Sequence, residues 1–80
     1  GPALAIGDHG NGVFILQAGL HRLGYDCPPS GDYDEATAAR VRAFQRHWRP
    51  EGVDGVADGE TRARLMAIVR LVRAEDELSL

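Results

Sequence analysis

GDYDEAT at Gly31–Thr37 returns as GVADGET at Gly55–Thr61, and both copies share the skeleton Gly-x-x-Asp-x-x-Thr. The Asp of each copy, Asp34 or Asp58, can accept hydrogen bonds from the free backbone N–H groups of a first helical turn. A Thr three positions later suits a variant of the capping box, and the leading Gly suits a tight backbone turn. The repeat therefore predicts two helices that begin in the same way, directly after Asp34 and Asp58.

Apolar residues recur at helical spacing in three segments. They are Val13, Leu16, Leu20 and Leu23 in the first segment, Val41, Phe44 and Trp48 in the second, and Leu65, Ile68, Val69 and Val72 in the third. Gly24 suits a left-handed cap after the first helix, and Pro50 ends the second. Arg70 and Arg73 are expected near the end of the third, where the helix dipole favours cations. The sequence predicts an all-α fold, a small three-helix bundle with two glycine-rich connecting loops.

Two further features concern the ends of these elements. Gly7, Asp8 and Asn11 form an incomplete third copy of the repeat before the first helix. The acidic segment AEDELSL, residues 74–80, follows the last strong periodic position and is expected to be a frayed helix end or a linker.

The composition suits one compact domain with a modest core. Of its 80 residues 44% are hydrophobic and 26% charged, so neither disorder nor a membrane class is indicated. All nine basic residues are arginine, and the net charge is −3, which argues against a broad nucleic-acid-binding surface. A helix-turn-helix DNA binder is thus a weak alternative. The chain contains no long apolar run, so membrane insertion is not predicted. The single Cys27 cannot form an internal disulfide.

Catalytic and metal sites are not expected. His9, His21 and His47 contain no pair at helical spacing and have no cysteine cluster beside them, whereas zinc requires three or four converging ligands. The densest acidic cluster is at residues 32–35, where capping explains Asp34 and the helix dipole explains Glu35. We therefore predict no catalytic residue, no metal and no cofactor.

Two pairs of residues lie unusually on their expected helices. Gln17 and Gln45 are polar but turned partly inward, so their amides either satisfy buried loop backbone groups, which we favour, or contact a ligand. Phe14 and Ile15 point outside the expected core arc. Either the N-terminal segment PALAI, residues 2–6, covers them, or they contact a neighbouring domain.

The segments VFILQAGLHRLGY, SGDYDEATAARVRAFQRH and VDGVADGETRARL together resemble the peptidoglycan-binding type 1 family, a small three-helix domain of bacterial cell-wall hydrolases. The resemblance extends from about Gly7 to Val72. Within it, AFQRHWRPEGVDGVADGET is especially similar to the C-terminal domain of zinc-dependent N-acetylmuramoyl-L-alanine amidases. The second copy of the repeat departs from the first by having Ala57 where the first has Tyr33, so a symmetric pair of sugar sites is not expected.

The resemblance implies a noncatalytic, monomeric module in the bacterial envelope that holds a wall hydrolase on peptidoglycan while a separate domain cuts. An alternative is an interaction domain that packs on the parent catalytic domain without touching glycan. The domain would occupy residues 7–73. Residues 1–6 would be a linker that begins with a protease-processing scar, Gly1–Pro2, and residues 74–80 would be a tail.

The first candidate ligand contacts lie on the second helix, where Arg42, Arg46 and Arg49 recur at i, i+4 and i+7. Guanidinium groups bind carboxylates in a bidentate fork, and peptidoglycan stem peptides carry carboxylates. An ordinary solvated face is the alternative explanation of this stripe. Trp48, which lies beside the stripe in sequence, is a further candidate, although continuing the core is its main expected role.

The second group of candidates flanks the proline-containing loop. Tyr25 and Tyr33 can stack a ring on the apolar face of a sugar while the hydroxyl donates a hydrogen bond. Core packing is the alternative for both tyrosines. Asp32, in the same loop, completes the candidate set.

Overall fold

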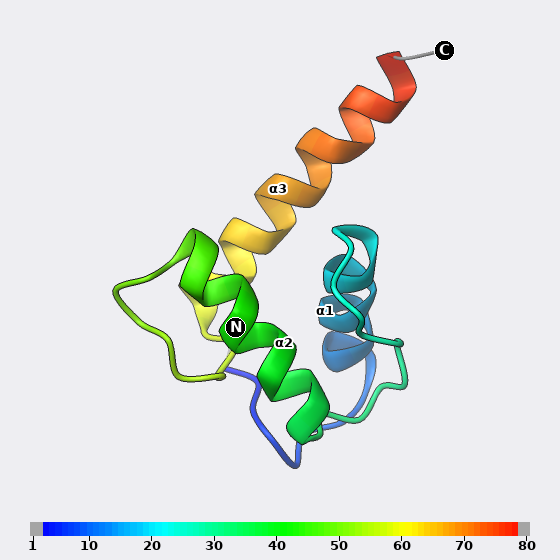
Figure 1. Ribbon diagram of the computed structural model, residues 1–80. Coiled ribbons are helices and arrows are strands. Elements are labelled where there is room, and N and C mark those ends of the chain that lie inside the picture. Colours follow the sequence, from blue (N-terminus) through cyan, green and yellow to red (C-terminus); the bar gives the residue numbers. More distant parts are fainter. Residues whose placement is uncertain (1–2, 79–80) are drawn as a thin grey trace.

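The computed structural model describes residues 3–78 and contains three helices: α1 (Asn11–Arg22), α2 (Glu35–Trp48) and α3 (Gly59–Leu78). Figure 1 shows α1 and α2 beside the first half of α3, while the second half of α3 projects from the rest of the molecule. The predicted all-α bundle with two connecting loops is confirmed. The expected scar, Gly1–Pro2, and the last two residues of the expected tail lie outside the described residues.

The repeated heptapeptide begins α2 and α3 as predicted. Oδ1 of Asp34 accepts hydrogen bonds from the Thr37 backbone N–H at 2.8 Å and from the Thr37 hydroxyl at 2.9 Å. Oδ1 of Asp58 accepts the Thr61 backbone N–H at 2.8 Å. These backbone donors are the main reason that the pKa of each carboxyl is lowered. The leading glycines have φ of +86° and +76°, which side-chain-bearing residues rarely adopt.

Helix α1 begins differently, so the incomplete third copy is not a helix cap. Its N-cap is Gly10, which makes no side-chain capping bond, and the Asp8 carboxylate instead accepts the backbone N–H of Ala5 at 2.8 Å. The end of α1 follows prediction. Gly24 has φ of +98°, and the next N–H, of Tyr25, donates to the Leu20 carbonyl at 3.0 Å, which is the Schellman arrangement.

Helix α3 is longer than the periodicity predicts, because it continues through the acidic segment to Leu78. Arg70 and Arg73 therefore lie in its interior, and the expectation that they lie near the end of the helix is wrong. Ala, Glu and Leu in the segment after Arg73 are all strong helix formers, and no Gly or Pro interrupts them.

The core lies where the three helices meet. Its fully buried apolar residues are Val13, Leu16, Leu20, Cys27, Tyr33, Ala38, Val41, Phe44, Ala57 and Leu65. Helix α3 contributes only Leu65 to this list, and the end of α3 projects from the bundle (Figure 1). Trp48 lies at the edge rather than within the core, 39% exposed, with its ring centroid 6.4 Å from that of Phe44.

The N-terminal segment crosses both copies of the repeat. Leu4 forms an antiparallel bridge with Ala57, and His9 forms one with Asp32. The segment therefore joins the two connecting loops and does not cover Phe14 and Ile15, which remain 45% and 52% exposed.

Candidate functional site

Gln17 organises the loop before α2 from inside the bundle. Its Oε1 accepts the Gly31 backbone N–H at 2.8 Å, and its Nε2 donates to the Asp32 carbonyl and the Thr37 hydroxyl, both at 3.0 Å. The side chain is 1% exposed. The favoured interpretation, that this amide satisfies loop backbone groups, is confirmed.

Gln45 repeats the arrangement for the loop before α3. Its Oε1 accepts the N–H groups of Asp54 and Gly55 at 3.1 and 3.0 Å. Its Nε2 donates to the Val56 carbonyl at 2.9 Å and to the Thr61 hydroxyl at 3.1 Å. Both glutamines thus connect a helix to one copy of the repeat. The sequence repeat reflects a repeated loop structure as well as a repeated cap.

The two candidate tyrosines lie in different surroundings. Tyr33 is 2% exposed, and its hydroxyl donates to the Gly55 carbonyl at 2.6 Å, joining the first copy of the repeat to the second. Burial raises the pKa of Tyr33 to about 12. Tyr25 is half-buried and packs edge-on against Phe44, with ring centroids 6.1 Å apart. Core packing therefore accounts for Tyr33, whose ring is not on the surface.

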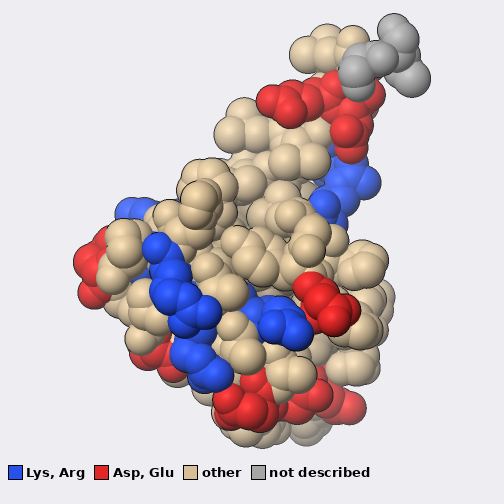
Figure 2. Space-filling view, in the orientation of Figure 1, with Lys and Arg blue, Asp and Glu red and all other residues tan. Residues whose placement is uncertain are grey.

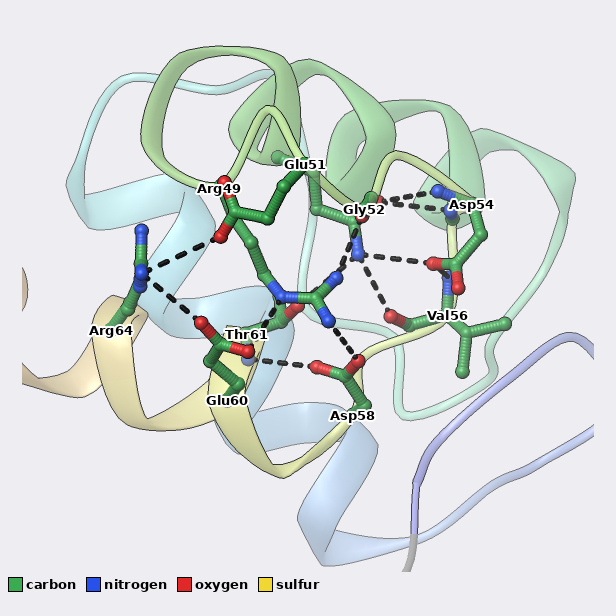
Figure 3. A network of polar contacts seen from close by, with 11 residues as sticks. Arg49, Glu51, Gly52, Asp54, Val56, Asp58, Glu60, Thr61 and Arg64 are labelled. Carbon is green, nitrogen blue, oxygen red and sulfur yellow. Dashed lines mark hydrogen bonds and ion pairs between the residues drawn. The ribbon is translucent and has the colours of Figure 1, made fainter.

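Arg49 leaves the helix-two stripe and turns into the loop that follows it (Figure 3). Its guanidinium donates to the Gly52 carbonyl at 2.7 Å and lies 3.0 Å from the Asp58 carboxylate and 3.2 Å from that of Glu60. A Cβ at Gly52 would overlap with this guanidinium, so a side chain at position 52 would displace it. The side chain of Arg49 is only 15% exposed, so these internal partners account for it.

Arg64 extends the same network to the end of α2. It lies 3.0 Å from Glu60 and 3.6 Å from Glu51, and it also donates to the Trp48 carbonyl. The Glu60 carboxylate beside Arg49 is the main reason that the pKa of the Arg49 guanidinium is raised. Through these contacts the loop between α2 and α3 is attached to both helices (Figure 3).

Arg42 and Arg46 remain as the accessible part of the stripe, on the face of α2 along which Figure 2 shows arginine side chains gathered. Arg42 donates to Glu35 at 2.8 Å, but the Glu35 side chain is 72% exposed, so this pair is weak. Arg46 is exposed and has no ion pair with any described residue. These two arginines can meet an external anion.

The remaining candidates are not gathered around that stripe. At about 100° per residue, the side chain of Trp48 leaves α2 roughly 160° away from that of Arg46. Asp32 is exposed, and its backbone carbonyl is already bonded by Gln17. The structure therefore brings together Arg42 and Arg46, groups Tyr25 and Trp48 around Phe44, and separates the two sets.

Sequence patterns did not reveal a groove between α1 and α3, which we name the α1–α3 groove. It consists of two hollows with volumes of about 270 and 300 Å³, and Ile15 and Met66 line both of them. The outward direction of Phe14 and Ile15 was the one signal of this groove in the sequence. Its other wall could not be foreseen, because it depends on which side of α3 faces α1.

Within residues 3–78, no three histidine, cysteine or carboxylate side chains are grouped so as to hold a metal ion. None of the described helices combines the length and apolar character that crossing a membrane requires. Burial raises the pKa of the Cys27 thiol.

Comparison with known proteins identifies a likeness over most of the chain. The family model described as "Putative peptidoglycan binding domain" matches residues 9–65. The crystal structure of the SleB N-terminal domain superposes with a TM-score of 0.78 and is 28% identical, over 84% of this chain and 92% of that one. No curated protein sequence matches the chain. The segment matched by the family model contains both glutamines and both copies of the repeat.

Proposed function

The chain belongs to the family of putative peptidoglycan binding domains, and from this membership we propose that it is a noncatalytic, monomeric module that holds a wall hydrolase on peptidoglycan. The observation that carries the proposal is the family match over residues 9–65, a range that contains all the fully buried apolar residues named above. The bacterial envelope is the corresponding location.

We further propose that the parent hydrolase is an N-acetylmuramoyl-L-alanine amidase. The support is the segment from Ala43 to Thr61, where Trp48, Arg49 and Pro50 follow the Phe-Gln-Arg sequence as in amidase C-terminal domains. In this chain the same segment forms the end of α2 and the network around Arg49.

Arg42 and Arg46 are the proposed points of electrostatic attraction to the wall. Stem peptides carry carboxylates, and arginine binds carboxylates through paired hydrogen bonds. Because both side chains are accessible and the chain as a whole has a net charge of −3, this attraction is local to α2. Affinity for a single soluble fragment is expected to be weak, with tethering to a polymer supplying effective concentration.

Co-sedimentation with purified peptidoglycan sacculi across a salt series tests this proposal. We expect the wild-type domain to sediment, less so as salt rises, and Arg46→Ala to reduce the bound fraction severalfold. The matched control is Arg70→Ala, which removes one exposed arginine charge from α3 instead of α2. Absence of wild-type sedimentation at every salt concentration would refute the proposed function.

The exposed Phe14 and Ile15 favour one second candidate function, an interaction domain that packs on its parent catalytic domain. In that case the domain alone would not sediment with sacculi, but it would bind the separately purified catalytic domain. Changing Ile15 to Ser would then weaken that contact.

A further inference from the structure

The α1–α3 groove has the dimensions and lining of a ligand site. The first hollow lies at the beginnings of the two helices, where Gly12 and Gly59 have no side chains to fill it, and a Cβ at Gly59 would meet no heavy atom within 4 Å. The second continues along α1 past Phe14, with Val69 on the opposite wall. The two hollows adjoin at Ile15 and Met66, which line both of them.

All the ionisable side chains that line the α1–α3 groove are arginines. Arg62 lines the first hollow, Arg22 and Arg73 line the second, and no acidic residue lines either. Arg22 is paired with Asp76 at 2.5 Å, where both side chains are largely exposed. Arg73 has no ion pair with a described residue. The α1–α3 groove therefore suits a ligand that is partly apolar and carries negative charge.

Peptidoglycan offers two kinds of ligand, a glycan strand and a stem peptide. The stem peptide combines alanine methyl groups with carboxylates, whereas sugar rings place hydroxyl and amide groups on a neutral chain along most of their length. An apolar floor between arginines matches the first combination, because carboxylates form charge-assisted bonds with guanidinium groups.

Length also fits. Arg62 and Arg73 are eleven residues apart on α3, which corresponds to about 16 Å along the helix. An extended peptide of about five residues spans the same distance at roughly 3.3 Å per residue. Carboxylates near the two ends of a short peptide can thus reach both arginines at once.

We infer that the α1–α3 groove binds the stem peptide of peptidoglycan, with methyl groups against Ile15, Met66 and Val69 and carboxylates against Arg62 and Arg73. This inference rests on the proposed function and deepens it by naming the part of the polymer that is bound. The arginines of α2 then attract the polymer, and the groove determines which part of it is held.

The test is an NMR titration of the isotope-labelled domain with three soluble probes. They are a stem pentapeptide, the same peptide with its carboxyl groups amidated, and a chitooligosaccharide. We expect the free peptide to shift the methyl signals of Ile15, Met66 and Val69 with Kd on the order of 1 mM, and amidation to weaken it about tenfold. Groove shifts caused by the chitooligosaccharide and not by the peptide would overturn the inference.

A matched pair of variants separates the groove from general charge effects. Arg73→Gln is expected to weaken peptide binding about tenfold, while Arg70→Gln, less than one turn away on α3 and outside the groove lining, should change it less than twofold. Equal effects of the two variants would contradict the inference.

Sedimentation of the same proteins with sacculi distinguishes the two proposals. If the wild type sediments and Arg73→Gln sediments equally well, the groove inference fails and the proposed function stands. If the wild type does not sediment, both fail.

Discussion

Two buried side-chain amides, of Gln17 and Gln45, each connect a helix to one of the two loops that contain the repeat. Gln17 and Gln45 each accept a glycine N–H and donate to a loop carbonyl and to the Thr of one copy of the repeat. An apolar side chain of similar size would fill the space but would leave these loop groups unpaired. Such groups are costly when buried, so these residues stabilise the loops more than any surface ion pair does.

Replacing Gln17 with Leu is expected to lower the free energy of unfolding by about 2–4 kcal/mol, because several loop groups lose their partner. Gln45→Leu should have a similar effect. Urea denaturation followed by circular dichroism measures both. Gln17→Glu is the informative companion variant, since it keeps the acceptor for Gly31 but loses both donors. A Gln17→Leu variant as stable as wild type would contradict this account of the loop.

The carboxylates of Asp34 and Asp58 stabilise the beginnings of α2 and α3 by accepting backbone N–H groups of the first turn. Each has a pKa below its usual value, so the folded state holds the ionised form more strongly than the unfolded state does. The resulting stabilisation is present above the unfolded pKa of about 3.9 and is lost as the pH falls through the lower folded value. Acid should therefore weaken the starts of α2 and α3 together.

Asn caps a helix about as well as Asp but does not titrate. We expect the double variant Asp34→Asn, Asp58→Asn to lose less of its melting temperature than wild type when the pH falls from about 5 to about 2. Thermal melts by circular dichroism across this range provide the measurement. Asp26→Asn, which removes an exposed carboxylate outside the caps, is the control. Its melting temperature should fall between these pH values as much as that of the wild type. If the melting temperature of the double variant falls as much as that of the wild type, the two caps do not cause the loss of stability in acid.

The N-terminal segment joins parts of the molecule that are distant in sequence. Leu4 exchanges two backbone hydrogen bonds with Ala57, of 3.0 and 2.8 Å, and Asp8 accepts the Tyr33 N–H at 2.9 Å. The Tyr33 hydroxyl then reaches Gly55 in the other copy. Both loops are thus held by one short segment.

Deleting residues 1–6 tests this arrangement and has an internal control. The Ala57 amide should lose its protection from hydrogen exchange, whereas the Tyr33 amide, whose partner Asp8 remains, should keep most of its protection. We expect the free energy of unfolding to fall by about 1–3 kcal/mol, from two hydrogen bonds and the partly buried Leu4. Equal loss of protection at both amides would mean that the segment acts as one unit.

Much of this fold was predictable because its signals are local. A cap depends on residues three positions apart, and a helix face depends on spacings of three and four, so Asp34, Asp58 and the positions Val13, Phe44 and Leu65 were identified from the chain alone. The inward amides of Gln17 and Gln45 followed from the same periodicity. The full length of α3 was missed because the apolar pattern fades where the helix leaves the bundle, although helix formers continue.

The candidate site was less predictable, because exposure depends on contacts between distant residues. Arg42, Arg46 and Arg49 are equivalent by spacing, yet only Arg49 faces Asp58 and Glu60, which lie across a loop. Tyr33 and Trp48 are both aromatic residues at a helix end, yet Tyr33 is buried and bonded to the Gly55 carbonyl, whereas Trp48 lies at the edge of the core. Local patterns in the chain were enough to place the starts of α2 and α3, the buried faces of the helices and the family resemblance. Which arginines of α2 stay accessible, and that α1 and α3 leave a groove between them, could be seen only in the packed molecule, because both depend on how whole helices pack against one another.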